Sequence, residues 1–218
     1  MEAPAVAASS PNLQVGYLFG KAWETFKQNM GISLLMFLLY SVLTNLGSGG
    51  SLVLNIAGIL ISGPVIAGTY NAFLRMLRGE KVPFVSMFDG FKEFVRAFCA
   101  FWLMILAVLG GLILLIVPGI IIALGLIPVM FLVLETDLGA VDTIKRAWAM
   151  TKGHKGSLFV LFLAIIGLNI LGLLALVIGL IVTGTITLFI GAAVYDELAK
   201  ASAPEPIPVA PPEATPIG

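Results

Sequence analysis

Three long stretches of this chain contain no charged residue, and they constrain its fold more than any other feature. They cover residues 28–74, 97–134 and 156–195 of the 218-residue sequence. A helix needs about 20 apolar residues to cross the hydrocarbon core of a bilayer. Each stretch is nearly twice as long as one crossing requires, and it is too short for three crossings. Each stretch is therefore expected to cross the membrane twice, as a helical hairpin.

The composition also indicates a membrane protein. Hydrophobic residues make up 59% of the chain and charged residues only 11%, whereas an average soluble domain has about 25% charged residues. A soluble fold of this size has too few polar groups to cover so much apolar surface. The net charge is zero, so the composition gives no reason to expect a nucleic-acid partner.

Turn signals divide the three stretches into six expected membrane helices. Proline and glycine interrupt helices, so NLGSGGS at Asn45–Ser51 is expected to divide the first stretch and Pro118–Gly119 the second. The third stretch has no polar turn, and its break is expected near residues 172–179. The expected fold class is all-α, a polytopic membrane helix bundle of three hairpins. The six helices are expected at about 30–46, 51–75, 98–117, 119–135, 157–175 and 178–197.

The charges fall on one side of these hairpins. All twelve Lys and Arg residues lie on the side of the termini, and the three far-side turns contain none. Short cytoplasmic loops carry the excess of Lys and Arg in membrane proteins. Both termini are therefore expected in the cytoplasm, with the chain as a multi-pass protein of the cell (inner) membrane.

A short basic segment occurs twice, each time before an uncharged stretch. Lys21–Gly31 reads KAWETFKQNMG and Arg146–Gly156 reads RAWAMTKGHKG, and the same offset of 125 residues pairs Tyr70 with Tyr195. A looser copy, MFDGFKEFVRAF, lies at Met87–Phe98. Internal repeats are common in membrane folds. The chain is expected to contain a disordered N-terminus at 1–12, one membrane domain at 13–198 with repeat units at about 13–78, 84–135 and 137–198, and a disordered Pro/Ala-rich tail at 199–218.

Each repeat unit is expected to begin with an amphipathic helix at the cytoplasmic membrane interface. Apolar residues recur there at steps of three or four, which is typical of a helix. In such a helix Trp lies at headgroup depth while Lys and Arg attract anionic lipid, and Gly31 and Gly156 are expected to allow the bend into the crossing helix. A helical linker packed beneath the bundle is the alternative interpretation. The candidate interface residues are Trp23, Lys27, Phe91, Lys92, Arg96, Arg146, Trp148 and Lys152.

Two prolines indicate a candidate cavity. Pro64 and Pro128 each lie partway along the second helix of a hairpin, where proline kinks a helix, and broken helices line the binding sites of some transporters. Thr69 and Asn71 would supply polar contacts there. Hydrogen bonding between packed helices is the alternative role for such side chains. Pro64, Thr69, Asn71 and Pro128 are therefore the kink and cavity candidates.

No motif in the sequence indicates catalysis. The centres of the expected helices contain no ionisable residue, although ionisable groups within the membrane usually mark functional sites. Cys99 and His154 are the single cysteine and the single histidine, and nothing in the sequence orients either as a catalytic pair. No cofactor and no metal are expected. The expected partners are membrane lipids with anionic headgroups, and a protein partner or a second copy of the chain is left open.

Three motifs carry a family resemblance: KAWETFKQNMG at 21–31, VPGI at 117–120 and AVDTIKRAWAMTKGHKG at 140–156. Over about 13–198 the chain resembles a group of bacterial six-helix membrane proteins of unknown function, and it is similar to the membrane domain that accompanies glycerophosphodiester phosphodiesterases. This resemblance implies a polytopic inner-membrane protein. The catalytic domain of those phosphodiesterases is a separate soluble barrel, and nothing in this chain resembles it.

The sequence leaves two main hypotheses for function. The first is a non-catalytic integral membrane protein that organises lipid or a partner protein at the cytoplasmic membrane interface. The alternative is a transporter or permease component with a cavity near the kinked second and fourth helices. An intramembrane enzyme is a third hypothesis, with Cys99 and His154 as its only candidate pair.

Overall fold

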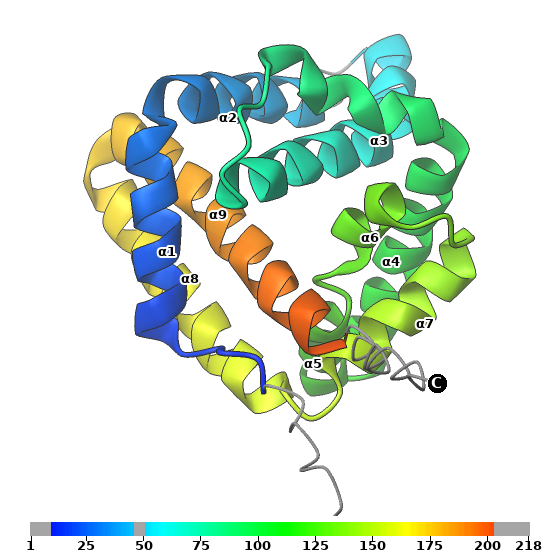
Figure 1. Cartoon of the computed structure of the whole chain (residues 1–218). Coiled ribbons are helices and arrows are strands. Elements are labelled where there is room, and N and C mark those ends of the chain that lie inside the picture. Colours follow the sequence, from blue (N-terminus) through cyan, green and yellow to red (C-terminus); the bar gives the residue numbers. More distant parts are fainter. Residues whose placement is uncertain (1–9, 46–50, 203–218) are drawn as a thin grey trace, which may run out of the picture.

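The computed structural model describes residues 10–45 and 51–202, and every regular element within these ranges is a helix (Figure 1). The all-α fold class is therefore confirmed. The elements are α1 (Val15–Gln28), α2 (Met30–Asn45), α3 (Leu52–Leu77), the 3-10 helix η2 (Phe84–Glu93), α4 (Phe94–Leu114), α5 (Ile116–Gly125), α6 (Val129–Glu135), α7 (Ala140–Thr151), α8 (Lys155–Leu174) and α9 (Leu176–Ser202).

Several of these helices are long and apolar enough to cross a membrane. Five meet that condition alone, and α1 with α2 give a sixth if this pair, bent by 100°, is counted as one span. The helices are therefore those of a multi-pass membrane protein. The five are Leu52–Leu77, Phe84–Leu114, Ile116–Glu135, Lys155–Leu174 and Gly179–Ser202.

The second charge-free stretch turns earlier than the sequence predicts. The break lies at Leu115, which is extended with φ −167° and ψ 147°, and α5 begins at Ile116. Pro118 thus lies in the first turn of α5, where the N–H that proline lacks has no partner within the helix in any case. Gly119 is also helical, and it lies so close to α4 that a Cβ atom there would meet the Leu112 side chain at 2.5 Å. The prediction of a turn at Pro118–Gly119 was therefore wrong, because these residues serve the start and the packing of α5.

The fourth expected helix is divided in two. It was expected to run over 119–135 with a kink at Pro128, but α5 ends at Gly125 and α6 begins at Val129, with Pro128 as its N-cap. Residues 126–128 form the turn between them. The break between α8 and α9, at Ala175, lies within the predicted window of 172–179.

The bends that precede α2 and α8 do not lie at the predicted glycines. The bend before α2 is at Asn29, whose side chain donates a hydrogen bond to the Thr25 carbonyl 3.1 Å away. Before α8, Gly153 adopts φ +87°, a conformation that glycine tolerates best. Gly31 and Gly156 lie within α2 and α8, so the assignment of the bends to them was wrong.

The domain boundaries can be compared with the sequence prediction only in part. α9 continues to Ser202, past the expected end of the membrane domain at 198. Residues 10–12, expected to belong to a disordered end, form a segment beside the start of α8. The rest of the expected disordered ends (1–9 and 203–218) and most of the first far-side turn (46–50) lie outside the described residues.

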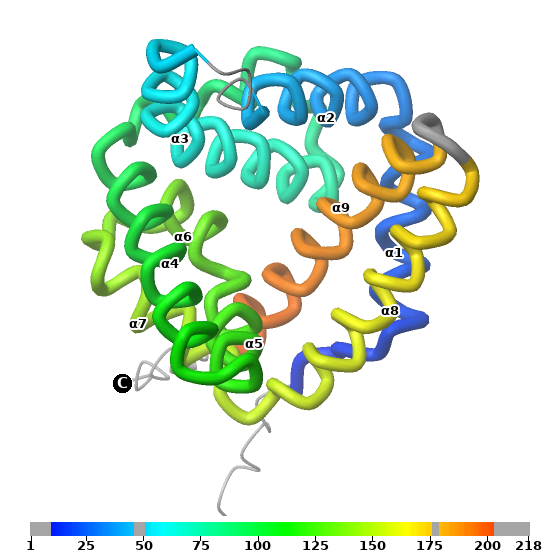
Figure 2. The backbone as a smooth tube through the Cα atoms, turned by 180° about the vertical axis from the view of Figure 1, so that it is seen from behind, coloured from blue at the N-terminus to red at the C-terminus, as the bar shows by residue number. Residues whose placement is uncertain are grey.

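α3 and α9 form the centre of the molecule, and the other helices surround them (Figures 1 and 2). In the most apolar window of each span, 61% of residues are buried in α9, 56% in α5 with α6 and 39% in α3, but only 17% in the spans of α4 and α8. The rings of Phe73 on α3 and Phe189 on α9 lie 4.6 Å apart, and both residues are fully buried. α1 and α7 lie in front of α8 and α4 in Figure 1 and behind them in Figure 2.

A close backbone crossing holds η2 against α3. A Cβ atom on Gly68 would lie 2.1 Å from the Met87 carbonyl oxygen, and a Cβ atom on Gly90 would lie 1.9 Å from the Pro64 carbonyl oxygen. Only glycine leaves room for such an approach. The part of α3 around Pro64 is therefore packed against η2.

Candidate functional site: the ionic cluster and the basic helices

A cluster of charged side chains joins helices that are distant in the sequence. Asp196 on α9 is only 4% exposed, and a buried carboxylate requires charged or hydrogen-bonding partners. Its oxygens lie 3.0 Å from Lys21 Nζ on α1, 3.1 Å from Arg78 Nε after α3, and 2.7 Å from Lys200 Nζ one turn further along α9. Three basic groups therefore surround one buried carboxylate.

Arg78 extends the cluster to the end of α6. Its guanidinium donates hydrogen bonds to both carboxylate oxygens of Glu135, and the hydroxyl of Tyr195 donates to Glu135 Oε2 at 2.8 Å. Partial burial disfavours the charged form of Arg78, but hydrogen bonds to Glu135 and Asp196, and the attraction of their charges, raise the pKa of its guanidinium above the ordinary value. Arg78 is therefore the residue that connects α3, α6 and α9.

An aromatic stack continues from this cluster into the core. Phe131 on α6 lies between Tyr70 on α3 and Tyr195 on α9, with ring centroids 5.1 and 5.0 Å away. Offset stacking of this kind adds to the stabilisation that burial provides. Tyr70 and Tyr195 are the pair that the 125-residue offset aligns in the sequence, and in the structure they both stack on this one ring.

The cluster consists of ion pairs that join separate helices, so its chemistry suits a structural role. Glu197 completes the cluster, since its carboxylate lies 3.5 Å from Lys21 Nζ and 3.7 Å from Lys200 Nζ, and three carboxylates therefore face three cations. This network connects the last turns of α9 to α1, α3 and α6, and such a network fixes the relative positions of the helices that it joins. Among the described residues, no three His, Cys, Asp or Glu side chains lie close enough together to hold a metal ion.

The candidate interface residues on α1 and α7 are mostly accessible. Trp23 is 46% exposed and stacks against Phe26, and Lys27 is exposed on the same helix. Trp148 is 38% exposed, and Lys155 Nζ lies 3.1 Å from the centroid of its ring, a cation–π contact. A Cβ atom on Gly125 would lie 2.5 Å from Trp148. Trp148 therefore also packs on α5, a role that the sequence did not indicate.

The other interface candidates divide into exposed and paired side chains. Phe91 and Lys152 are exposed, and Lys92 is exposed while paired with Asp89. Arg96 is partly buried, contacts Glu93 and Asp137, and donates to the Val133 carbonyl. Arg146 donates to the Ser202 carbonyl at 3.3 Å, at the end of α9. Arg96 and Arg146 thus have partners within the protein, which reduces their availability to lipid.

The kink and cavity candidates lie on α3 and at the start of α6, two helices that pack together through the stacked rings of Tyr70 and Phe131. Pro64 and Thr69 are buried in α3 against η2, Asn71 is partly buried on α3, and Pro128 is buried at the start of α6. The Thr69 hydroxyl is buried and has no hydrogen-bond partner among the described residues.

Cys99 lies in α4 and His154 precedes α8, and these helices lie on different sides of the molecule (Figures 1 and 2). The structure gives no support to a Cys99–His154 pair.

The ionic cluster was not predicted. Sequence reasoning placed its members at one end of the helices, but it gave no partners to Lys21, Arg78, Glu135 and Asp196. The one usable signal was the repeat. Its offset of 125 residues aligns the neutral Asn71 with Asp196, so Asp196 is the position at which the later repeat unit has gained a charge.

Comparison of the chain with protein-family models, with curated proteins and with solved structures finds no match in any of the three. The resemblance to six-helix membrane proteins therefore remains an expectation from the sequence.

Proposed function

We propose that this chain is a non-catalytic integral protein of the cell (inner) membrane that organises anionic lipid, or a partner protein, at the cytoplasmic membrane interface. In this proposal the helices form three membrane hairpins: α2 with α3, α4 with α5 and α6, and α8 with α9. The segments α1 and α7 lie along the interface, each before a hairpin, and both termini are cytoplasmic. The 3-10 helix η2, which precedes the remaining hairpin, packs against the middle of α3.

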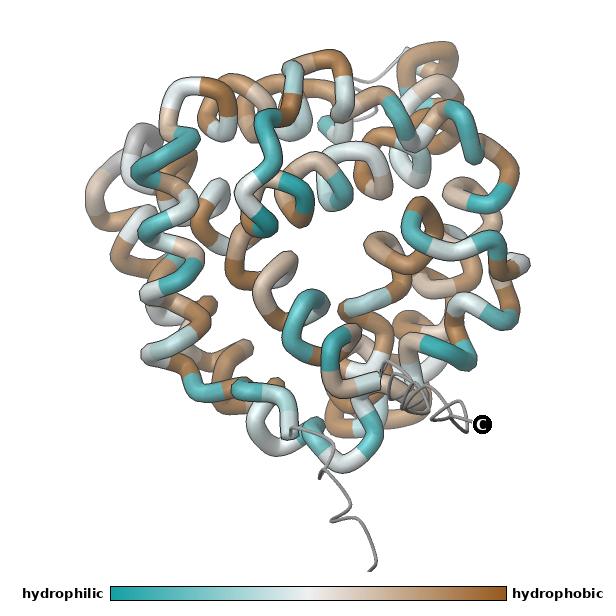
Figure 3. Tube along the Cα trace, viewed as in Figure 1, coloured by the Kyte–Doolittle hydropathy of each residue, from teal (hydrophilic) through white to brown (hydrophobic). Residues whose placement is uncertain are grey.

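The observation that carries the proposal is the placement of exposed Trp and exposed Lys side chains beside bare apolar helices. Trp23 with Lys27 and Trp148 with Lys152 lie on or beside α1 and α7, and neither lysine has an acidic partner among the described residues. The neighbouring α8 exposes many large apolar side chains, and so much apolar surface requires lipid or protein to cover it. Figure 3 shows hydrophilic residues on α1, on α7 and near the end of α9, and mostly apolar residues on α8.

The test is the lipid that stays bound to the purified protein. The variant Trp23→Ala,Trp148→Ala in nanodiscs of mixed phosphatidylglycerol and phosphatidylcholine is expected to retain less phosphatidylglycerol than the unaltered protein. Trp102→Ala is the matched control, because Trp102 lies within α4 and donates to the Ile59 carbonyl. An unfolding temperature accompanies each variant, since Trp148 also packs on Gly125. Equal retention by all three proteins would refute the proposal.

A second candidate function is a transporter or permease component, and one observation favours it. Thr69 is buried near Pro64 without a hydrogen-bond partner in the described part of the chain, and a functional role is one explanation for an unsatisfied buried polar group. Flux across proteoliposomes is the measurement, with Pro64→Leu and Pro128→Leu as variants. Flux that neither change alters would count against transport.

A further inference from the structure

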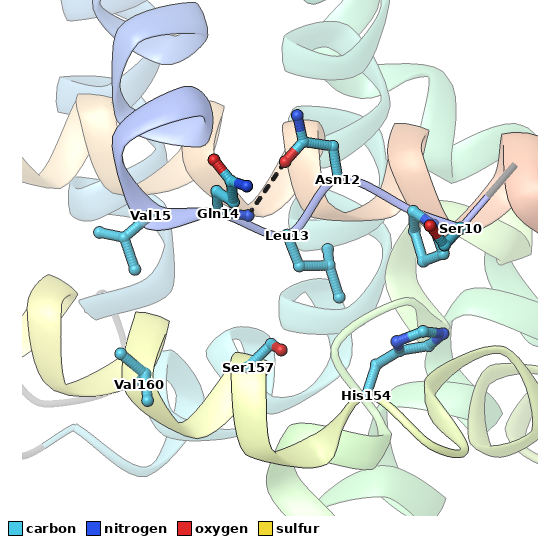
Figure 4. A pocket seen from close by; sticks show the side chains of 9 residues that line it. Ser10, Asn12, Leu13, Gln14, Val15, His154, Ser157 and Val160 are labelled. Carbon is cyan, nitrogen blue, oxygen red and sulfur yellow. Dashed lines mark hydrogen bonds between the residues drawn. The ribbon is translucent and has the colours of Figure 1, made fainter.

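Two adjoining clefts lie beside the N-terminal segment 10–15: the larger faces the start of α8, and the smaller faces the ends of α7 and α9. Their volumes are about 700 and 280 Å³, and Ser10, Pro11 and His154 line both, so the clefts meet at these residues. Figure 4 shows His154 and Ser157 on the α8 side of the larger cleft, opposite the segment that carries Leu13. The volume of the larger cleft lies within the range of about 300–1,000 Å³ that is typical of ligand sites.

One basic side chain without an acidic partner among the described residues, Lys152, lines the smaller cleft, and two more, Arg146 and Lys155, lie nearby in the chain. Of the twelve Lys and Arg residues, seven lie within 4.0 Å of a described carboxylate oxygen and five do not. Three of those five, Arg146, Lys152 and Lys155, belong to α7, to the α7–α8 turn or to the first residue of α8. Lys152 lines the smaller cleft, and no Asp or Glu is among the described residues that line either one. The described walls of the clefts therefore carry an uncompensated positive charge.

The far end of the larger cleft is apolar. Val15 and Val160 line it, and Val160 is 55% exposed on α8. The most apolar window of α8 has only 17% of its residues buried, so this helix faces outward. The two clefts together thus run from Lys152 in the smaller one, past His154 where they meet, to the apolar end of the larger one on a helix that faces lipid in the proposed placement.

We infer that the two adjoining clefts together bind the headgroup of a single anionic phospholipid. The phosphate lies near His154, where the clefts meet, with Lys152 on one side and Ser157 on the other, and the acyl chains begin against Val15 and Val160. The inference rests on the proposed function and gives it a specific site. Lys152 supplies the charge, while the imidazole and the hydroxyl supply hydrogen-bond donors for phosphate oxygens. The apolar end discriminates a lipid from a soluble phosphate.

The test is native mass spectrometry of the full chain in detergent, titrated with phosphatidylglycerol and, separately, with phosphatidylcholine. The unaltered protein is expected to bind one phosphatidylglycerol more tightly than the rest. Lys152→Ala,His154→Ala is expected to weaken that first binding step about fivefold or more, which is the attraction expected of one basic residue for anionic lipid. The matched control is Lys27→Ala,Lys81→Ala, which removes two other lysines, away from the cleft, that also lack an acidic partner among the described residues.

The outcomes separate this site from the general proposal. Loss of tight binding in the cleft variant alone supports the site. Equal weakening in both double variants would overturn the site while leaving a general attraction of the basic face to anionic lipid. Equal binding of phosphatidylcholine, or displacement of the bound lipid by inorganic phosphate, would also overturn it. Lys152→Glu alone repeats the test with a change at one exposed position, and unaltered binding in that variant would overturn the site as well.

Discussion

The Nε atom of Arg78 lies 3.1 Å from Oδ1 of Asp196, although 118 positions separate the two residues in the chain. The same guanidinium binds Glu135 at the end of α6. Because α1 also reaches Asp196 through Lys21, four elements meet at one charged point. The ionic cluster therefore holds the first and last parts of the fold together.

The first prediction concerns the buried carboxylate. Asp196→Asn keeps the shape of the side chain but leaves three basic groups around a neutral amide. The free energy of unfolding is expected to fall by about 3 kcal/mol, as when one partner of a buried ion pair is removed. Thermal unfolding in detergent, followed by circular dichroism, measures the change. Asp142→Asn is the control, because Asp142 pairs with Lys145 at the surface and such pairs contribute about 0–1 kcal/mol; equal losses would contradict the role of the cluster.

The second prediction concerns the aromatic stack. Phe131 is 1% exposed, and Phe131→Ala is expected to lower the free energy of unfolding by about 3–5 kcal/mol through lost contacts and a cavity. Tyr195→Phe keeps the ring but removes the hydrogen bond to Glu135 and is expected to cost about 1 kcal/mol. Tyr17→Phe serves as the comparison, since its hydroxyl bonds Glu197 at the surface at 3.3 Å. A Tyr195→Phe protein as stable as the unaltered one would show that the hydroxyl contributes nothing.

The third prediction concerns the crossing of α3 and η2. Gly68→Ala and Gly90→Ala each place a methyl group against backbone atoms that cannot move aside, and each is expected to cost at least about 2 kcal/mol, within the range for overpacking. Gly20→Ala in α1 meets no atom within 4 Å and is expected to leave stability unchanged or to raise it slightly. The melting temperatures of the three variants are compared in one detergent. Similar values for all three would show that the crossing of α3 and η2 has room for a methyl group.

The sequence was sufficient for the helices because their lengths follow from the charge-free stretches. A bilayer requires about 20 apolar residues for each crossing, and α3, α4 and α8 have lengths close to those expected. α9 is longer, because it continues through charged residues to Ser202. The turns were harder to predict. Pro118 looks like a helix breaker in the sequence, but in the first turn of α5 it disrupts no hydrogen bond.

The ionic cluster could not be predicted because its members come from separate elements. Lys21, Arg78, Glu135 and Asp196 each lie near the end of an apolar stretch, and their order in the chain does not say which will meet. Only the packing of α9 against α1 and α3 brings them together. The exposure of Trp23, by contrast, depends only on the local periodicity of α1, in which Ala22 and Phe26 are buried and Trp23 is 46% exposed.

The fourth prediction compares Gly153, in the turn between α7 and α8, with Gly156, within α8. Gly153 has φ +87°, so Gly153→Ala is expected to destabilise the protein by about 1 kcal/mol through backbone strain. Gly156 lies in the first turn of α8, and a methyl group added there would meet no atom within 4 Å, so Gly156→Ala is expected to raise stability by up to about 1 kcal/mol. Chemical unfolding measures the free energy of unfolding of both variants. A Gly156→Ala protein less stable than the Gly153→Ala protein would indicate that the bend lies at Gly156 after all.

The fifth prediction concerns membrane topology. In a Cys99→Ser background, single cysteines in place of Leu115 or Ala175 lie in turns between long apolar helices and are expected to react with a membrane-impermeant maleimide from outside the cytoplasmic membrane. Cysteines in place of Lys81 or Lys152 are expected to react only after the membrane is made permeable, because short basic segments remain in the cytoplasm. Denatured protein provides the control for intrinsic reactivity. Labelling of the Leu115 position from the cytoplasmic side in inverted vesicles would show that α4 and α5 do not form a hairpin across the bilayer.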